Sequence, residues 1–206
     1  MTTLPLIWPE AADVGELLAA PADGGWARQE LAGRFAIEPL DTLDEASLAP
    51  LDRLVLAQPR ALGPAENVAL DGWVRGGGRL LLFADPMLTR HSRYPVGDRR
   101  RPQDVALLSP ILAHWGLELL FDDAQARGER LVEIENAPIP VDLAGTLRLS
   151  PGAACTLAGG GLLARCRLGK GQVVVLADAA VLDDPEEGET GPRKVALGRL
   201  LALALD

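Results

Sequence analysis

Two aspartates stand directly after two hydrophobic runs that are typical of buried strands. Asp85 follows "RLLLFA", and Asp178 follows "QVVVLA". In open α/β sheets, ligands bind outside the carboxyl ends of the strands, so both carboxylates stand where a metal ion or a polar substrate could be held. The alternative is that each side chain caps the turn after its strand, as Asp does routinely. We favour the capping role for both residues.

The segment 90–101, "RHSRYPVGDRRR", concentrates positive charge after the first of these strands. Its basic side chains are Arg90, His91, Arg93, Arg99, Arg100 and Arg101. Because the whole chain carries a net charge of −9, such a patch suits an anionic ligand or an acidic partner. The alternative is a solvated loop whose arginines pair with the protein's own carboxylates. We favour binding, because the segment contains a single acid, Asp98.

The glycines in "RGGGRLLLFADP" (75–86) raise the question of a phosphate-binding loop. Such a loop needs its glycines after a strand and before a helix, where backbone N–H groups converge on the anion. Here the glycines follow a helical pattern that begins at Gly63-Pro64, and they precede a strand. The three glycines are therefore predicted to end the helix.

Other motifs for catalysis are missing from the sequence. There is no G-x-S-x-G elbow for a nucleophilic serine, and "RLGKGQ" departs from a phosphate loop at Ala164 and Gly171. Cys155 and Cys166 lack the spacing of a zinc site or a redox pair, and we interpret them as small buried hydrophobic side chains rather than a disulfide or a nucleophile. The sequence thus predicts no catalytic residue, no metal ligand and no cofactor, and it leaves the redox compartment open.

The expected elements alternate between strand and helix at first and are mostly short strands from residue 130 onward. Strands are expected at 4–8, 35–40, 53–59, 79–85 and 117–123. Helices are expected around Val14, Leu17 and Leu18, at 26–33, at 64–75, and at 109–116 with Ser109 as N-cap. "RLGKGQ" is expected to form a hairpin turn. The last helix carries an apolar stripe of Leu197, Leu200, Leu201, Ala204 and Leu205.

Length and composition bound the class of protein. The chain has 206 residues, which suits one domain over residues 1–206. Its net charge of −9 argues against nucleic-acid binding by bulk electrostatics. No apolar run reaches the roughly 18 residues of a membrane span, and the start "MTTLPLIWPE" lacks the features of a signal peptide. An anchor or signal could lie upstream in a longer gene product.

The stretch "LDRLVLAQPRALGPAENVALDGWVRGGGRLLLFADPM", together with "GKGQVVVLADAAVLDD", resembles the soluble domain of gliding-motility-type auxiliary components of ABC transporters. The opening "TTLPLIWPE" is similar to that family's first strand, and the resemblance continues over residues 51–121 and 169–184. It implies an α/β fold of the flavodoxin-like, class I glutamine-amidotransferase-like kind. This fold is a three-layer sandwich with a mostly parallel central sheet, here with a β-rich C-terminal portion.

The resemblance also implies a place on the periplasmic or extracytoplasmic face of a membrane, although this sequence departs from the family in having no membrane helix of its own. We expect a non-catalytic auxiliary domain of an ABC-type transport system that binds a ligand or another protein, with membrane transporter subunits as partners. The alternative is a metal-dependent hydrolase or transferase that uses the two strand-end aspartates. A sugar- or peptidoglycan-binding module is disfavoured, because the tryptophans mostly fit core positions: Trp8, Trp26, Trp73 and Trp115.

Overall fold

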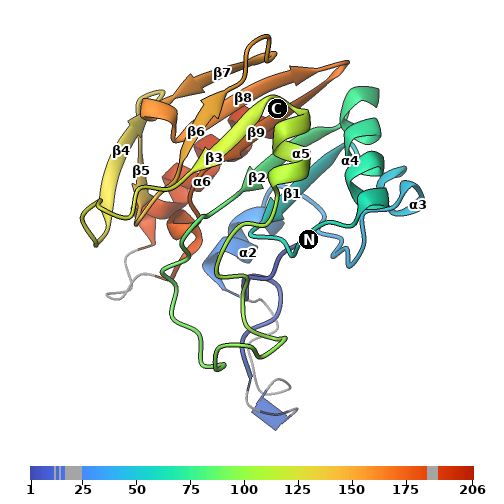
Figure 1. Ribbon diagram of the computed structural model, residues 1–206. Helices are drawn as coiled ribbons and strands as arrows, with labels where there is room; N and C mark the ends of the chain where they lie inside the picture. The colour runs from blue at the N-terminus through green and yellow to red at the C-terminus, as the bar shows by residue number, and fades with distance from the viewer. Residues whose placement is uncertain (12, 14, 17–24, 185–189) are drawn as a thin grey trace.

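The computed structural model describes residues 1–11, 13, 15–16, 25–184 and 190–206 (Figure 1), and strands and helices alternate between residues 53 and 120. The helix expected around Val14, Leu17 and Leu18 lies outside the described residues. None of the described helices is long and apolar enough to cross a membrane.

A five-stranded mixed sheet forms the centre of the molecule. In spatial order its strands are β1 (Arg53–Ala57), β2 (Arg79–Phe83), β9 (Gly171–Leu176), β8 (Leu163–Leu168) and β7 (Cys155–Ala158). β1, β2 and β9 run parallel, whereas β8 and β7 are antiparallel to their neighbours. The prediction of a mostly parallel sheet is therefore wrong. The physical reason is the turn at Gly169-Lys170, because so short a connection between β8 and β9 allows only antiparallel pairing.

Two antiparallel strand pairs accompany this sheet. β3 (Leu117–Leu120) pairs with β6 (Thr146–Leu149), and β4 (Arg130–Ile134) pairs with β5 (Ala137–Val141). Six of the nine described strands lie between residues 130 and 176, which confirms the expected β-rich C-terminal portion. The fold is thus mixed α/β.

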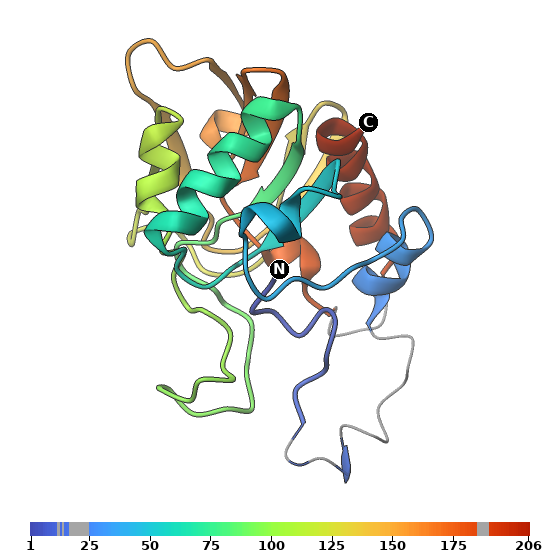
Figure 2. The same ribbon diagram turned by 90° about the vertical axis from the view of Figure 1, so that its right-hand side faces the viewer.

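Helices cover both faces of the sheet (Figure 2). α4 (Pro64–Gly76) and α5 (Ser109–His114) lie on one face, and α6 (Gly191–Leu205) and α2 (Trp26–Ala32) lie on the other. The short helix α3 (Glu45–Leu48) packs beside α4, and two 3-10 turns, η1 (Gly159–Gly161) and η2 (Ala180–Leu182), complete the elements. The apolar stripe predicted for the last helix is buried, as expected. Ser109 is the first residue of α5 rather than its N-cap, which is Leu108.

β2 and β9 are buried along almost their whole length. Residues 80–83 of β2 and 173–176 of β9 have no exposed surface. A strand that is covered on both faces needs apolar side chains on both, which is why these runs are continuous rather than alternating. The hydrophobic runs thus identified the strands whose ends carry the two aspartates.

The triple glycine ends helix α4, as predicted. Gly77 has a φ of +133°, a conformation that residues with a side chain rarely adopt. Gly171 starts β9 so close to this helix that an added Cβ would lie 1.9 Å from the carbonyl oxygen of Val74. These glycines therefore serve the turn and the close approach of α4 to β9.

The predicted strand at residues 4–8 is not formed. Instead, Thr2 makes an isolated parallel bridge to Ala57, and its hydroxyl donates to the Ala57 carbonyl oxygen at 2.7 Å. Pro5 and Pro9 offer no N–H to a strand ladder, and Trp8 is 67% exposed. The strand predicted at 35–40 is also irregular backbone.

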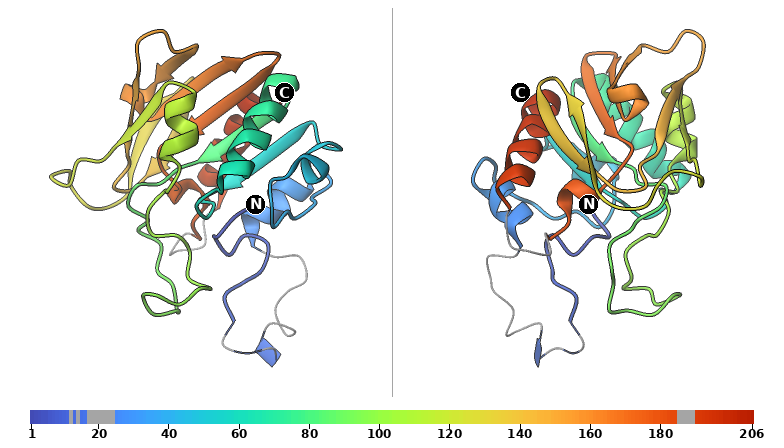
Figure 3. Two further views of the ribbon diagram at one scale, coloured as in Figure 1. Left: turned by 45° about the vertical axis from the view of Figure 1, so that its right-hand side comes forward. Right: turned by 90° about the vertical axis from the view of Figure 1, so that its left-hand side faces the viewer.

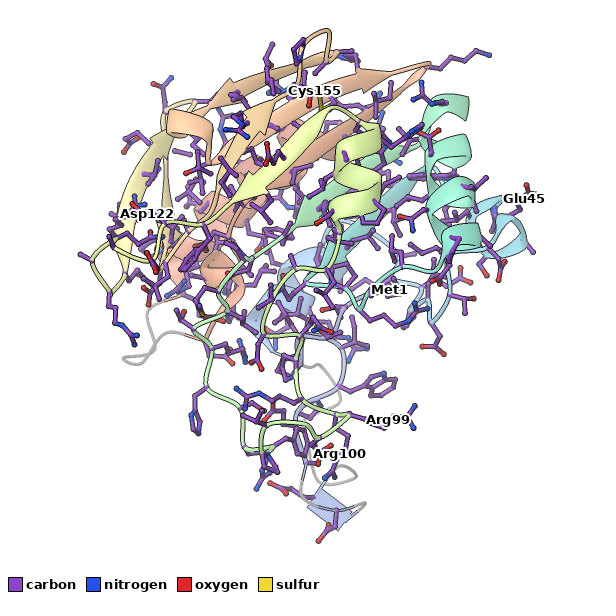
Figure 4. The ribbon with its side chains drawn as sticks, viewed as in Figure 1. Met1, Glu45, Arg99, Arg100, Asp122 and Cys155 are labelled. Carbon is purple, nitrogen blue, oxygen red and sulfur yellow. A yellow bond between two sulfur atoms is a disulfide. The ribbon has the colours of Figure 1, made fainter. Side chains whose placement is uncertain are left out.

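Cys155 and Cys166 form a disulfide (Figure 4), so their interpretation as two separate buried side chains is wrong. The register of β7 and β8 places the two residues directly opposite each other. That register is set by the turn η1 between the strands, which the cysteine spacing does not reveal. The bond fastens the edge strand β7 to the sheet.

Candidate functional site

Each of the three parallel strands is followed by a buried polar residue. Gln58 follows β1, Asp85 follows β2 and Asp178 follows β9, and none of these residues is more than 1% exposed. Because the last residues of the three strands are paired in register, the three side chains gather at one edge of the sheet. The structure thus brings the two predicted aspartates together and adds Gln58, which was not predicted.

Gln58 links the ends of β1 and β2. Its Nε2 donates to the carbonyl oxygens of Asp85, at 2.9 Å, and Gln103, at 2.8 Å. Its Oε1 accepts from the Asp85 backbone N–H at 2.8 Å. The amide is therefore fully engaged in holding backbone. Its signal in the sequence is its position, directly after a buried strand and before Pro59.

Both carboxylates accept backbone hydrogen bonds with both of their oxygens. Asp85 accepts from the N–H groups of Met87, at 2.8 Å, and Ala179, at 3.1 Å. Asp178 accepts from the N–H groups of Ala180, at 2.6 Å, and Asp142, at 3.0 Å. The first contact of each aspartate caps the turn after its own strand, and the second holds a segment distant in the sequence. Both residues therefore cap a turn, as predicted, and both also accept a hydrogen bond from a distant segment, which was not predicted.

Burial dominates the electrostatics of this pair. It raises the pKa of Asp85 to about 7, although two backbone N–H groups favour the charged form. Burial and, after it, the charge of Asp85 raise the pKa of Asp178 well above its usual range. The two carboxyl groups therefore take up protons jointly. Burial also raises the pKa of the nearby Asp183 to about 6, a rise that Arg90 opposes.

A metal ion would need more ligands than this pair supplies. In the part of the chain that the structure describes, no three His, Cys, Asp or Glu side chains are grouped so that they could hold a metal ion. The oxygens of Asp85 and Asp178 already face N–H donors, whose positive ends would repel a cation. The metal-dependent alternative finds no support in these contacts.

Two chain segments, residues 8–11 and 87–104, extend beyond this edge of the sheet (Figure 1, Figure 3). We call these two segments together the arm. The Tyr94 hydroxyl donates to the Ala11 carbonyl oxygen at 2.8 Å and accepts from the Ala11 N–H at 3.0 Å. The Glu10 carboxylate accepts from the Ser92 hydroxyl at 2.7 Å. These bonds hold together two segments that are far apart in the sequence.

Most arginines of the arm pair with carboxylates of the same chain. Four of the five form ion pairs: Arg90 with Asp183 and Asp184, Arg93 with Glu16, Arg100 with Asp98, and Arg101 with Asp104. Arg99, labelled in Figure 4, and His91 form no ion pair with a described residue. Internal pairing, the alternative to binding, accounts for the four arginines, and recognition of an anion stays a prediction that now centres on Arg99.

The predicted site residues fall into two groups. Asp85 and Asp178 form one group, buried at the sheet edge, and the basic residues form the other, on the arm. Arg90 approaches the first group through its ion pair with Asp183, at 3.2 Å. Within the described residues, no arginine of the arm bonds to Asp85 or Asp178 themselves.

Comparison with known proteins gives one family match and several similar folds. The profile of a family described as "ABC-type uncharacterized transport system" matches residues 19–136. The mmIFT52 N-terminal domain is similar in structure, with a TM-score of 0.58 and 16% identity over 85% of this chain and 88% of that one. Gan42B, a GH42 β-galactosidase from G. stearothermophilus, is similar with a TM-score of 0.53 and 14% identity over 86% of this chain and 25% of that one. At these identities the likeness is one of fold alone, and no curated protein matches the chain.

Proposed function

We propose that this chain, which belongs to the ABC-type uncharacterized transport system family, is a non-catalytic domain that binds transporter subunits. The premise is that members of the family are auxiliary components of such a transport system. The family match supports the transport system as the setting. The non-catalytic role and the identity of the contact surface rest on the described contacts.

The observation that carries the non-catalytic role is the state of the sheet edge. Enzymes with open α/β sheets place reactive groups outside the carboxyl ends of their strands. Here Asp85 and Asp178 stand at those ends, but both are buried and all four of their oxygens hold backbone N–H groups. Because both carboxyl groups are at most 1% exposed, neither is accessible to a substrate or to bulk water.

The arm supports a role in binding. It extends away from the sheet (Figure 1), and two of its large hydrophobic side chains, Trp8 and Val96, are 67% and 85% exposed. Arg99 adds a positive charge that no described carboxylate neutralises. Aromatic and arginine side chains are enriched among the residues that dominate protein interfaces. We assign the contact with transporter subunits to this surface.

The proposal also includes the type of fold, the closer family relationship and the number of domains. We take the fold as a variant of the flavodoxin-like, amidotransferase-like sandwich and the chain as a relative of gliding-motility-type components, on the support of three parallel strands with helices on both faces. One cluster of buried side chains runs from Leu4 to Leu205, which supports a single domain over residues 1–206.

The disulfide supports a location on the oxidising side of a membrane, because such bonds form and persist outside the cytoplasm. Alkylation of the denatured protein, isolated from its host without reductant, tests this location. We expect Cys155 and Cys166 to stay unmodified until a reductant is added. Two free thiols in freshly isolated protein would contradict the location while leaving the transporter role standing.

Affinity capture from solubilised membranes tests the function itself. The tagged chain is expected to recover the ATPase and membrane subunits of one transport system. A tagged chain with Val195→Ser, a change at an exposed position on α6, which is not part of the arm, is the matched control and should recover the same subunits. Recovery of soluble enzymes alone would contradict the proposal.

A further inference from the structure

A hollow of about 430 Å³ lies beside the buried aspartate pair. Its walls come from three segments: 87–89 after β2, 121–127 after β3, and 142–143 after β5. This volume falls in the range of small-molecule sites, roughly 300–1,000 Å³. The segment 87–89 places it outside the carboxyl end of β2, where open α/β sheets bind ligands.

The wall opposite β2 is held by hydrogen bonds. The Gly128 N–H donates to Oδ1 of Asp142 at 3.0 Å, and Nε2 of Gln125 donates to the Ala144 carbonyl oxygen at 3.0 Å. Both bonds fasten the loop after β3 to the segment after β5. The Asp142 N–H in turn donates to Asp178 at 3.0 Å. The hollow therefore has a built shape that depends on the buried pair.

Charges of both signs line the hollow without neutralising each other. Arg127 is exposed there, as is Asp123, and Asp142 is half-buried. None of the three forms an ion pair with a described residue, and the bond from Gly128 engages one oxygen of Asp142. The apolar part of the lining consists of Met87, Leu88, Phe121 and Leu143.

The mixed charge selects among classes of ligand. A simple anion would be attracted by Arg127 but repelled by the carboxylates of Asp123 and Asp142. A simple cation would be attracted by the two carboxylates but repelled by the guanidinium of Arg127. A ligand with both a carboxylate and an ammonium group satisfies all three side chains, and a guanidinium binds a carboxylate with two parallel hydrogen bonds.

We propose that this hollow binds a small zwitterion of the amino-acid type with an apolar side chain. Its carboxylate lies at Arg127, its ammonium group at Asp142 and Asp123, and its side chain against Phe121 and Leu143. This inference rests on the proposed binding role of the chain, for which it names a ligand class. The hollow shares residues 87–89 with the arm but lies apart from Arg99, as the separation of the labelled Asp122 and Arg99 in Figure 4 shows.

Isothermal titration of the full chain tests the ligand class. The probes are L-leucine, L-methionine and L-phenylalanine, and at least one should bind with a Kd of about 1 mM or tighter. For L-leucine the matched analogues are isoamylamine, which lacks the carboxylate, and 4-methylpentanoate, which lacks the ammonium group, with corresponding analogues for the other two probes. Both analogues should bind at least about tenfold more weakly than the amino acid. Absence of binding by all three amino acids, or analogues that bind equally well, would overturn the proposal.

Variants locate the site. Arg127→Gln and Asp142→Asn should each weaken binding about tenfold, and the amide introduced by the second change keeps an oxygen that can accept from Gly128. Arg99→Gln is the matched control, because it also removes an exposed arginine without an ion pair to a described residue. Unchanged binding in Arg127→Gln, or equal loss in Arg99→Gln, would contradict this site.

The failure of this inference can be told apart from the failure of the proposed function. The Arg127→Gln chain should capture transporter subunits as well as the unchanged chain does. If the titrations fail while capture succeeds, the ligand class is wrong and the transporter role stands. If the unchanged chain captures no transporter subunit but binds the amino acid through Arg127, the partner is wrong and the ligand site stands.

Discussion

The carboxyl edge of the sheet and the arm both carry charged residues that are candidates for a functional site in the sequence, and the two regions use those charges in different ways. At the sheet edge, Asp85 and Asp178 are buried and bonded to backbone. On the arm, arginines such as Arg100 are exposed and paired with nearby carboxylates, while Arg99 has no described partner. The first arrangement holds the chain in place, and the second keeps part of its charge available to solvent.

The difference shows how the surroundings decide what a charge contributes. A buried carboxylate pair costs desolvation energy and is kept only where hydrogen bonds offset that cost. An exposed ion pair contributes little to stability, so an arm of this kind can exchange its internal partners for those of another protein. We therefore assign stability to the sheet edge and binding to the arm.

The largest expected effect is on stability at the sheet edge. Asp178→Ala removes the acceptor for the N–H groups of Ala180 and Asp142, which are then unpaired, the first in a buried and the second in a partly buried position. The free energy of unfolding should fall by about 2–4 kcal/mol, as measured by urea unfolding. Asp98→Ala, which removes a half-buried carboxylate of the arm, is the control and should change the free energy of unfolding little. Equal losses in both variants would remove the contrast between the two regions.

The pH dependence of stability should have opposite signs for the two regions. Because burial raises the pKa values of Asp85 and Asp183 to about 7 and about 6, the folded state holds protons that the unfolded chain releases. The free energy of unfolding should therefore fall as the pH rises from about 4.5 to about 7, and the raised pKa of Asp178 acts in the same direction. The hydrogen bond from the Arg100 side chain lowers the pKa of Asp98 to about 2, so the contribution of Asp98 is present at neutral pH and is lost at strongly acid pH.

Urea unfolding across this pH range measures the slope, and Asp85→Asn should flatten it between about pH 4.5 and 7. The Asp98→Ala chain is the control. Because the Asp98 carboxylate of the unchanged chain titrates below this pH window, its removal should leave the slope unchanged. Stability that rises with pH through the window would contradict the assignment of raised pKa values to the buried carboxyl groups.

The smallest expected effect on stability comes from the arm. Changing Arg99, Arg100 and Arg101 to Ser removes two surface ion pairs, and the melting temperature should stay nearly unchanged. Capture of transporter subunits should become weaker, and its dependence on salt should become flatter, because fewer charges cross the interface. A clear drop in melting temperature with capture intact would show that these arginines serve the fold instead.

The sequence predicted the elements that carry strong local signals. The runs in β2 and β9 are continuous because both faces are covered, and the "RLGKGQ" turn is set by its glycines, so these elements are confirmed. The run at 4–8 is also hydrophobic, but Pro5 within it and Pro9 after it offer no N–H for strand pairing, and this prediction is wrong. A hydrophobic run therefore predicted a strand correctly where its residues could also supply the backbone N–H groups that strand pairing needs.

The candidate site could be predicted only in part. Asp85 and Asp178 were identified because each follows an obvious strand, and their proximity follows from the parallel pairing of β2 with β9. The contact of Asp178 with Asp142 and the role of Gln58 depend on loops whose paths no local pattern specifies. The disulfide was missed for the same reason, because it requires the register of β7 against β8.

Parallel capture with two variants tests the central claim most directly. Trp8→Ser changes the exposed aromatic side chain of the arm, and Asp85→Asn changes the buried sheet edge. Each tagged chain is incubated with solubilised membranes at a temperature where its circular dichroism spectrum is that of the folded protein, and the recovered transporter subunits are quantified. The account predicts that Trp8→Ser loses most of the captured subunits and that Asp85→Asn captures as much as the unchanged chain. Full capture by Trp8→Ser together with loss in folded Asp85→Asn would contradict it.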